Sequence, residues 1–311
     1  PFVTIWNIPT ERCAEKYNVT LNLEVFDVLA NDQQSFIGQD ITLFYSKELG
    51  LLPYYTSEGM PVNGGLPQNA SLQAHLQQAT RDIKVTLPTL PSPAYSGLAV
   101  IDWEKWRPLW VRNWASMDIY QQQSEELLNG TNKVLAYVRH RVAEAFAMQH
   151  GVLDGGIPVL PYSQIAFDCT VDFLSQEDLM NTIGESAAQG AAGIILWGSL
   201  NYSNSKEMCL RLKDYVEGPL GHYVVNVTAS ADLCSQTLCS GQGRCVRQED
   251  KQGFLHLDPS SFAINLQAGK PWLLTQSLEP SDDISGLAEE FRCQCYDEWQ
   301  GPRCNTQDIS S

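Results

Sequence analysis

The strongest constraint on the fold is a series of short apolar runs that alternate with helix-like segments. The runs lie at residues 3–6, 41–45, 98–101, 157–162, 193–197 and 222–227. Short runs of this kind, rich in β-branched residues, are typical of strands buried on both faces. Parallel strands need a crossover between them, usually a helix. The alternation therefore predicts an α/β fold with a parallel sheet, and acidic residues at a strand end suit a (β/α) barrel of TIM type.

Three of the intervening segments have helical patterns. Apolar residues at helical spacing over 72–83 follow Ser71, a residue type that caps helix N-termini. Residues 175–178 have the pattern of a capping box. A third apolar stripe covers residues 134–146. We expect a helix at each position.

Two carboxylates, Asp102 and Glu104, follow the apolar run at 98–101. Side chains alternate along a strand, so these two point to one side and Trp103 to the other. Mutual repulsion and poor solvation raise the pKa of at least one of them. A protonated acid beside an ionised carboxylate is what cleavage of a glycosidic bond needs. A strand that simply ends in solvent would carry the same tripeptide equally well.

The flanking residues favour a carbohydrate site. Four of the eight tryptophans, Trp103, Trp106, Trp110 and Trp114, lie here, and aromatic faces stack on sugar rings. Their spacing would also suit a packed helix face. Three arginines, Arg107, Arg112 and Arg141, have the geometry to bind sugar carboxylates, although structural ion pairs would use the same groups.

Composition limits the partners and the compartment. The net charge of −16, from 36 acidic and 20 basic residues, argues against nucleic acid and opposes binding of a polyanion at neutral pH. An acidic compartment would reduce that conflict. Nine cysteines and five glycosylation sequons favour the secretory pathway. The sequons are Asn18, Asn69, Asn129, Asn201 and Asn226.

Several other features are expected to be absent. The apolar stretch at 191–197 is too short to span a membrane, and the C-terminal residues have no lipid-anchor signal. The N-terminal residues do not have the pattern of a signal peptide, so we expect a mature or trimmed chain. The five histidines are scattered and no Cys-x2-Cys pair occurs, so neither a metal nor another cofactor is expected.

Residues 97–114 resemble the catalytic strand of the animal hyaluronidases, glycoside hydrolase family 56, which cut hyaluronan. The resemblance is greatest to the somatic, lysosomal-type members. It extends over residues 1–7, 41–45, 63–71, 140–146, 184–198, 226–228 and 239–245.

The resemblance implies a two-part chain and a mechanism. Residues 1–230 would form the barrel domain and 231–311 an EGF-like module with a long inserted loop. Glu104 would be the general acid and base, and Asp102 would orient the substrate acetamide, which attacks its own anomeric carbon with retention.

By the same resemblance, six residues line or support the pocket: Trp197, Tyr45, Asn7, Arg107, Arg141 and Asn226. The alternative interpretation of Trp197 is a core residue at the end of a strand. The alternative interpretation of Asn226 is a glycosylation site with no role in the pocket. The implied partner is hyaluronan, with chondroitin as a further candidate. A monomer in a lysosomal or extracellular location is expected.

The family also implies the disulfides. Six cysteines with EGF-like spacing allow fifteen pairings. The resemblance selects Cys234–Cys245, Cys239–Cys293 and Cys295–Cys304, and it pairs Cys13 with Cys209. Cys169 is left over, as a buried free thiol or an intermolecular bridge.

One part of the family pattern is missing. Only residues 118–131 lie between the catalytic segment and the block that begins near Tyr137. At roughly 30 residues per βαβ unit, about a hundred residues with two or three strands are absent after about residue 128. The expected barrel is therefore incomplete or distorted, and it lacks the tyrosines of those strands.

Three interpretations remain. The chain is an active hyaluronan-cleaving glycosidase. Alternatively, it is a catalytically impaired or inactive secreted member that binds glycosaminoglycan or protein. In the third interpretation it fails to fold, because the lost strands leave sheet edges exposed.

Overall fold

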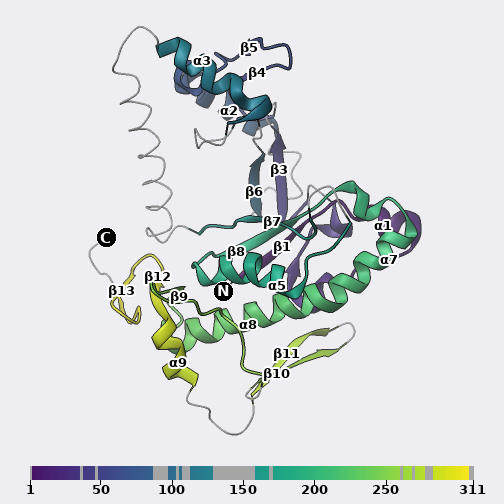
Figure 1. The fold of residues 1–311 in the computed structure, drawn as a ribbon, viewed down its shortest axis with the longest axis vertical. Coiled ribbons are helices and arrows are strands. Elements are labelled where there is room, and N and C mark those ends of the chain that lie inside the picture. The colour runs from purple at the N-terminus through teal and green to yellow at the C-terminus, as the bar shows by residue number, and fades with distance from the viewer. Residues whose placement is uncertain are drawn as a thin grey trace. The chain divides into compact units, whose positions relative to one another are not determined.

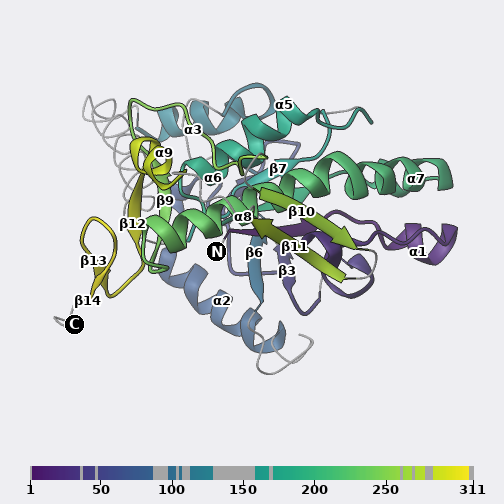
Figure 2. The same cartoon turned by 90° about the horizontal axis from the view of Figure 1, so that it is seen from below.

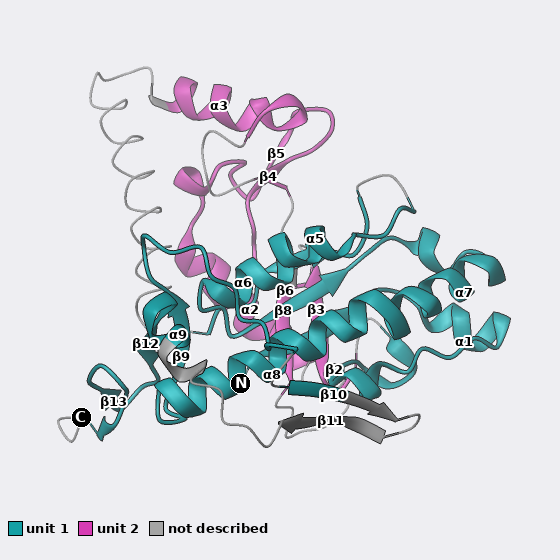
Figure 3. Cartoon of the chain, turned by 60° about the horizontal axis from the view of Figure 1, so that its bottom comes forward, with its two compact units in different colours: residues 1–36, 152–311 teal, residues 37–151 magenta. Residues whose placement is uncertain are grey.

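The computed structural model describes most of the chain as two compact units. Described residues are 2–35, 38–45, 48–86, 97–102, 105–106, 113–128, 158–167, 171–259, 262–267, 270–276 and 283–307. Unit 1 comprises Pro1–Phe36 and Val152–Ser311, and unit 2 comprises Ile37–Gly151 (Figure 3). Each unit is described by itself.

Unit 1 is built on a four-stranded parallel sheet, as the alternating pattern predicts. Its order is β2-β1-β8-β7 (Figure 1). The strands are β1 (Val3–Asn7), β2 (Val28–Leu29), β7 (Tyr162–Gln164) and β8 (Gly193–Trp197). β1 and β8 pair along their whole length, from Val3 opposite Gly193 to Asn7 opposite Trp197.

Alternate side chains divide between the two faces of this sheet. Trp6 and Leu196 are fully buried in a core cluster that also contains Leu212 of α7 (Lys206–Tyr215) and Val224 of α8 (Gly221–Leu238). Ile5 and Ile195, which point the other way, are buried as well (2% and 4% exposed) but lie outside that cluster. The sheet therefore has one face covered by helices and a second apolar face.

The prediction of a strand at residues 222–227 is wrong, because these residues belong to α8. Tyr223, Val224, Val225 and Val227 are all buried. A helix that is buried nearly all round has no polar stripe, so its sequence resembles a buried strand.

Two helix signals in unit 1 and unit 2 are confirmed. α2 (Leu72–Thr86) begins after Ser71, whose Oγ accepts a hydrogen bond from the Ala74 N–H at 3.2 Å. α5 (Gln176–Leu179) begins with a complete capping box between Ser175 and Asp178. The stripe at 134–146 lies outside the described residues.

Unit 2 contains a second parallel pair. β3 (Ile41–Tyr45) pairs with β6 (Leu98–Asp102), from Ile41 opposite Leu98 to Tyr45 opposite Asp102. β6 was expected to be buried on both faces, but Leu98 and Val100 are only partly buried and Ala99 is exposed. Among the described residues β6 pairs with β3 alone.

The rest of unit 2 includes an antiparallel pair, β4 (Tyr54–Tyr55) with β5 (Pro61–Val62). α3 (Asp118–Leu128) packs against it, and the Tyr55 N–H donates to the Tyr120 hydroxyl at 3.0 Å. The remaining short helices of the two units are α1 (Glu11–Tyr17), η1 (Leu23–Phe26), η2 (Asp32–Gln34), η3 (Pro67–Asn69), η6 (Ala115–Met117), η7 (Met180–Gly184), α6 (Glu185–Ala188), η8 (Leu200–Ser203) and η9 (Val216–Leu220).

The C-terminal part of unit 1 is rich in disulfides and antiparallel pairs. β9 (Gly243–Arg247) pairs with β12 (Phe291–Cys295), and β13 (Trp299–Gln300) with β14 (Thr306–Gln307). β10 (Phe262–Gln267) and β11 (Lys270–Gln276) form a hairpin (Figure 2), and α9 (Asp283–Glu290) follows. α8 runs without a break across residues 230 and 231, so this part shares a helix with the preceding one.

Four disulfides are formed, between the same partners that the family resemblance implied. They are Cys13–Cys209, Cys234–Cys245, Cys239–Cys293 and Cys295–Cys304. Cys169 lies outside the described residues. Within the described part of the chain, no helix has the length and apolar character needed to cross a membrane. The same residues contain no group of three potential metal ligands.

Candidate active site

The carboxyl ends of three parallel strands in unit 1 bring four polar and aromatic residues to one face of the sheet. Asn7 and Gln164 are both opposite Trp197 in the strand register. Tyr162 precedes Gln164 by two positions and therefore points to the same face. We call Asn7, Tyr162, Gln164 and Trp197 the strand-end row.

Asn7 provides an unused hydrogen-bond donor in this row. Its side chain is buried, with 4% exposed, and its Oδ1 accepts a hydrogen bond from the Tyr162 hydroxyl at 3.4 Å. Its Nδ2 is buried without a partner. An unsatisfied buried donor costs about 1–3 kcal/mol. The Nδ2 group is therefore available to donate to a bound ligand or water molecule.

Aromatic side chains lie beside that donor. Trp197 and Tyr162 are 39% and 43% exposed, so both present ring surface to solvent. A small number of placed polar groups beside aromatic faces is the usual make-up of a ligand site, and sugar rings bind well to such faces.

The loops after β1 and β8 hold the row in place. The Trp6 indole N–H donates to Thr10 Oγ1 at 3.0 Å, and the Ser203 hydroxyl donates to the Pro9 carbonyl at 2.8 Å. Directly after Trp197, a Cβ on Gly198 would lie 2.2 Å from the Tyr202 ring. Glycine is needed there because the backbone passes so close to Tyr202.

The candidate residues of unit 2 form a second group. Asp102 and Tyr45 are the last residues of β6 and β3 and are opposite each other in register. Tyr45 is 44% exposed, and its backbone N–H donates to Glu48 Oε2 at 2.8 Å. Asp102 is described in its backbone only.

Other predicted site residues cannot be placed with these. Glu104, Arg107, Arg112 and Arg141 lie outside the described residues, as do Trp103, Trp110 and the sequon Asn129. The geometry of the carboxylate pair therefore stays a prediction.

Asn226 is not in the strand-end row. It lies in α8, where its Oδ1 accepts a hydrogen bond from the Leu257 N–H at 3.2 Å. Tyr162 and Gln164, in contrast, were missed from the sequence. The signal was present, since polar residues directly follow the apolar run at 157–162, as Asp102 follows its own run.

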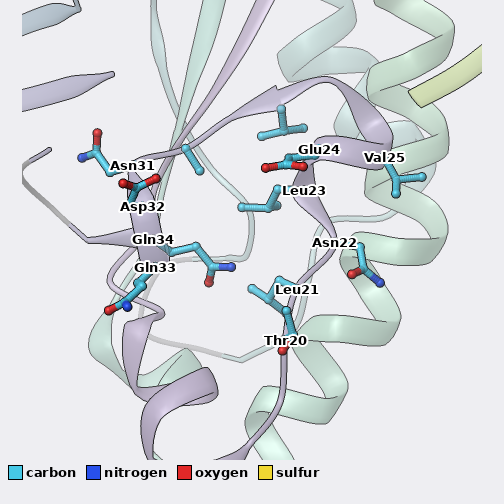
Figure 4. Close-up of a pocket in the computed structure, with 12 residues that line it drawn as sticks. Thr20, Leu21, Asn22, Leu23, Glu24, Val25, Asn31, Asp32, Gln33 and Gln34 are labelled. Carbon is cyan, nitrogen blue, oxygen red and sulfur yellow. The ribbon is translucent and has the colours of Figure 1, made fainter. Parts of the chain in front are cut away.

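A separate cavity of about 380 Å³ lies beside β2 (Figure 4). Residues 20–25 form one wall and residues 30–34 the other, with Glu24 and Asp32 on opposite walls. Gln34 in this cavity accepts a hydrogen bond from the Thr10 hydroxyl at 2.8 Å. The cavity contains none of the residues of the strand-end row.

The chain is similar to known proteins over almost its full length. A family model described as Hyaluronidase matches residues 1–135 and 125–308. Hyaluronidase-1 of Homo sapiens is 38% identical over 407 aligned positions, covering 99% of this chain and 93% of the relative. A hyaluronidase of Crotalus adamanteus is 31% identical, covering 99% of this chain and 91% of the relative.

A solved structure has a similar fold. Bee venom hyaluronidase, crystallised in complex with a hyaluronic acid tetramer, has a TM-score of 0.56 and 22% sequence identity. The structural match covers 73% of this chain and 100% of the bee venom chain.

These comparisons also bear on the missing stretch. The alignment with human Hyaluronidase-1 has 407 positions and this chain has only 311 residues, so the relative carries residues that this chain lacks. The family match is split into two parts that meet at residues 125–135, at the end of α3. The two-part match supports an internal deletion at that place. Because the family model matches nearly the whole chain and the human relative is 38% identical, the chain belongs to the hyaluronidase family.

Proposed function

We propose that this chain is an endo-β-N-acetylhexosaminidase that hydrolyses hyaluronan by substrate-assisted, retaining catalysis. The observation that carries the proposal is the strand-end row, in which an unpartnered amide donor lies among exposed aromatic rings. Family membership favours this activity over a non-catalytic role.

Glu104 has the first chemical role in this proposal. Its carboxylic acid protonates the glycosidic oxygen as that bond breaks, and its carboxylate then takes a proton from the attacking water. The acetamide oxygen of the substrate bonds to the anomeric carbon and is displaced by that water. Asp102 orients the acetamide and stabilises its positive charge.

The strand-end row binds the sugar. The Asn7 Nδ2 donates to a substrate oxygen, and the Trp197 ring packs against an apolar sugar face. By the family resemblance, Tyr45, Arg107 and Arg141 are proposed as further substrate-binding residues. Hyaluronan is the proposed substrate and chondroitin a further one.

We further propose that residues 1–230 form an incomplete (β/α) barrel and 231–311 an EGF-like module. The parallel pairing of six strands and the similarity to bee venom hyaluronidase support the barrel. The order of the last three disulfides supports the module. With the five sequons, the disulfides also support a location in the secretory pathway, either lysosomal or extracellular, and a monomer is proposed there.

The decisive experiment is turnover of hyaluronan at acid pH by the purified chain and by Glu104→Gln. The variant keeps shape but loses the acid, so turnover should fall by roughly 10² or more. Glu125→Gln, which changes an exposed carboxylate of α3, is the control and should leave turnover unchanged. Equal turnover in Glu104→Gln and the unaltered chain would end the assignment.

A further inference from the structure

A histidine joins the disulfide-rich part of unit 1 to helix α8. His256 Nε2 lies 2.7 Å from the hydroxyl oxygen of Tyr223, which is buried in α8. The two rings meet edge to face, with centroids 5.4 Å apart. His256 also stacks on Phe254, with centroids 5.7 Å apart and an interplanar angle of 15°. We call these three residues the His256 junction.

The junction holds the segment 251–258 against α8. Three positions along the helix from Tyr223, the Asn226 side chain accepts a hydrogen bond from the Leu257 N–H. Leu255 and Leu257, on either side of His256, are both buried. His256 is exposed, so protons reach it without unfolding of the segment.

The charged groups around the junction already have partners. Arg247 of β9, which lies over the Phe254 ring at 5.6 Å, donates to Glu185 of α6 at 2.9 Å. Glu290 of α9 pairs with Lys251 at 3.7 Å and accepts the Gly253 N–H at 3.0 Å. No ion pair joins His256 to a carboxylate within the described residues.

There is also space for the segment to move. A cavity of about 330 Å³ lies between α8, the segment and α9. Leu233, His256, Asp258 and Leu287 are among its lining. Asp258, on the same segment, is the remaining acidic group that faces this cavity together with Glu290.

We propose that His256 makes the attachment of segment 251–258 to α8 dependent on pH, so that the segment detaches in acid. A neutral ring with its proton on Nδ1 accepts the Tyr223 hydroxyl proton at Nε2. A protonated ring has no free lone pair at Nε2, so the Tyr223 hydroxyl proton loses its acceptor, and within the described residues no ion pair compensates the new positive charge.

Burial lowers the pKa of His256, which agrees with this direction. A lowered pKa means that the attached state prefers the neutral ring. The attachment therefore weakens as the pH falls below the ordinary histidine value of about 6.5 and continues to weaken until His256 itself is protonated.

Hydrogen exchange of the whole protein, followed by mass spectrometry at pH 7 and pH 5, tests this proposal. After correction for intrinsic exchange rates, peptides covering 251–258 should exchange several-fold faster at the lower pH. His256→Gln cannot titrate in this range and should abolish the difference. His222→Gln is the matched control, because His222 is an exposed histidine of α8, and it should retain the difference.

A second variant keeps the proposal testable if His256→Gln fails to fold. His256→Phe keeps the stacking on Phe254 but cannot be protonated, so it should also lack the pH difference. The proposal is overturned if either His256 variant keeps the pH difference of the unaltered chain, or if the unaltered chain shows none. Because no activity is measured, the outcome is independent of the proposed function.

Discussion

Gly184→Ala should destabilise unit 1 by a predictable route. Gly184 ends the π-helical turn η7, and a Cβ there would lie 2.3 Å from the Tyr223 hydroxyl oxygen and 3.3 Å from the Phe254 ring. Tyr223 is 6% exposed and packed in the core, so its ring has little room to move. Overpacking costs about 1–3 kcal/mol, and loss of the bond to His256 costs about 0.5–1.5 kcal/mol. Alanine is also the better helix former by about 1 kcal/mol, so we expect a net loss of about 1–3 kcal/mol in the free energy of unfolding.

Urea denaturation with the disulfides intact measures this loss. Gly286→Ala is the control, because a Cβ at Gly286 in α9 meets no atom within 4 Å. Alanine is the better helix former by about 1 kcal/mol, so Gly286→Ala should be neutral or stabilising. An equal effect of the two substitutions would contradict the steric argument.

A double-mutant cycle identifies the clashing atom. Tyr223→Phe removes the hydroxyl, after which the nearest atom of residue 223 lies 3.5 Å from the Gly184 Cβ position, an ordinary contact. In the Tyr223→Phe background, the loss of unfolding free energy caused by Gly184→Ala should be smaller by at least about 1 kcal/mol. If the cost of Gly184→Ala is the same with and without the hydroxyl, the reasoning is refuted.

Three other predictions concern separate features. Asn7→Leu should lower turnover on hyaluronan. It should leave the melting temperature unchanged or higher, because it removes the unpartnered buried Nδ2. A lower melting temperature with normal turnover would contradict this. Burial and then the nearby Asp27 carboxylate raise the pKa of Asp232, so the folded state holds its proton more tightly than the unfolded state. Asp232→Asn should therefore raise the melting temperature at pH 7, and the gain should shrink as the pH falls and vanish below about 3.9, where both states are protonated. Non-reducing peptide mapping should recover Cys13 linked to Cys209, with Cys169 open to alkylation; a link from Cys13 to a cysteine after Ser230 would disprove the pairing.

The parts of the fold that were predicted correctly are those with strong local signals. The runs at 41–45 and 193–197 are strands over those same residues. Ser71 and Ser175 cap helices because their hydroxyls satisfy backbone N–H groups that the first helical turn leaves free.

Features that depend on tertiary surroundings could not be predicted in this way. β2 was missed because two residues are too short for any pattern, and it exists only through pairing with β1. α8 was misassigned because neighbours bury it on nearly every side. The strand-end row depends on the register between β1, β7 and β8, which are far apart in sequence. The disulfides followed from family resemblance alone, since spacing left fifteen pairings open.

The Cys13–Cys209 bond has a covalent consequence for the whole chain. It joins positions separated by 196 residues, and all of unit 2 lies inside the ring that it closes. Closing a ring of that size stabilises the fold by roughly 5 kcal/mol, and each doubling of ring length changes this by only about 0.6 kcal/mol. Insertions or deletions within the ring therefore leave the bond's contribution almost unchanged. A protease that cuts once inside unit 2 would release no fragment until the disulfide is reduced.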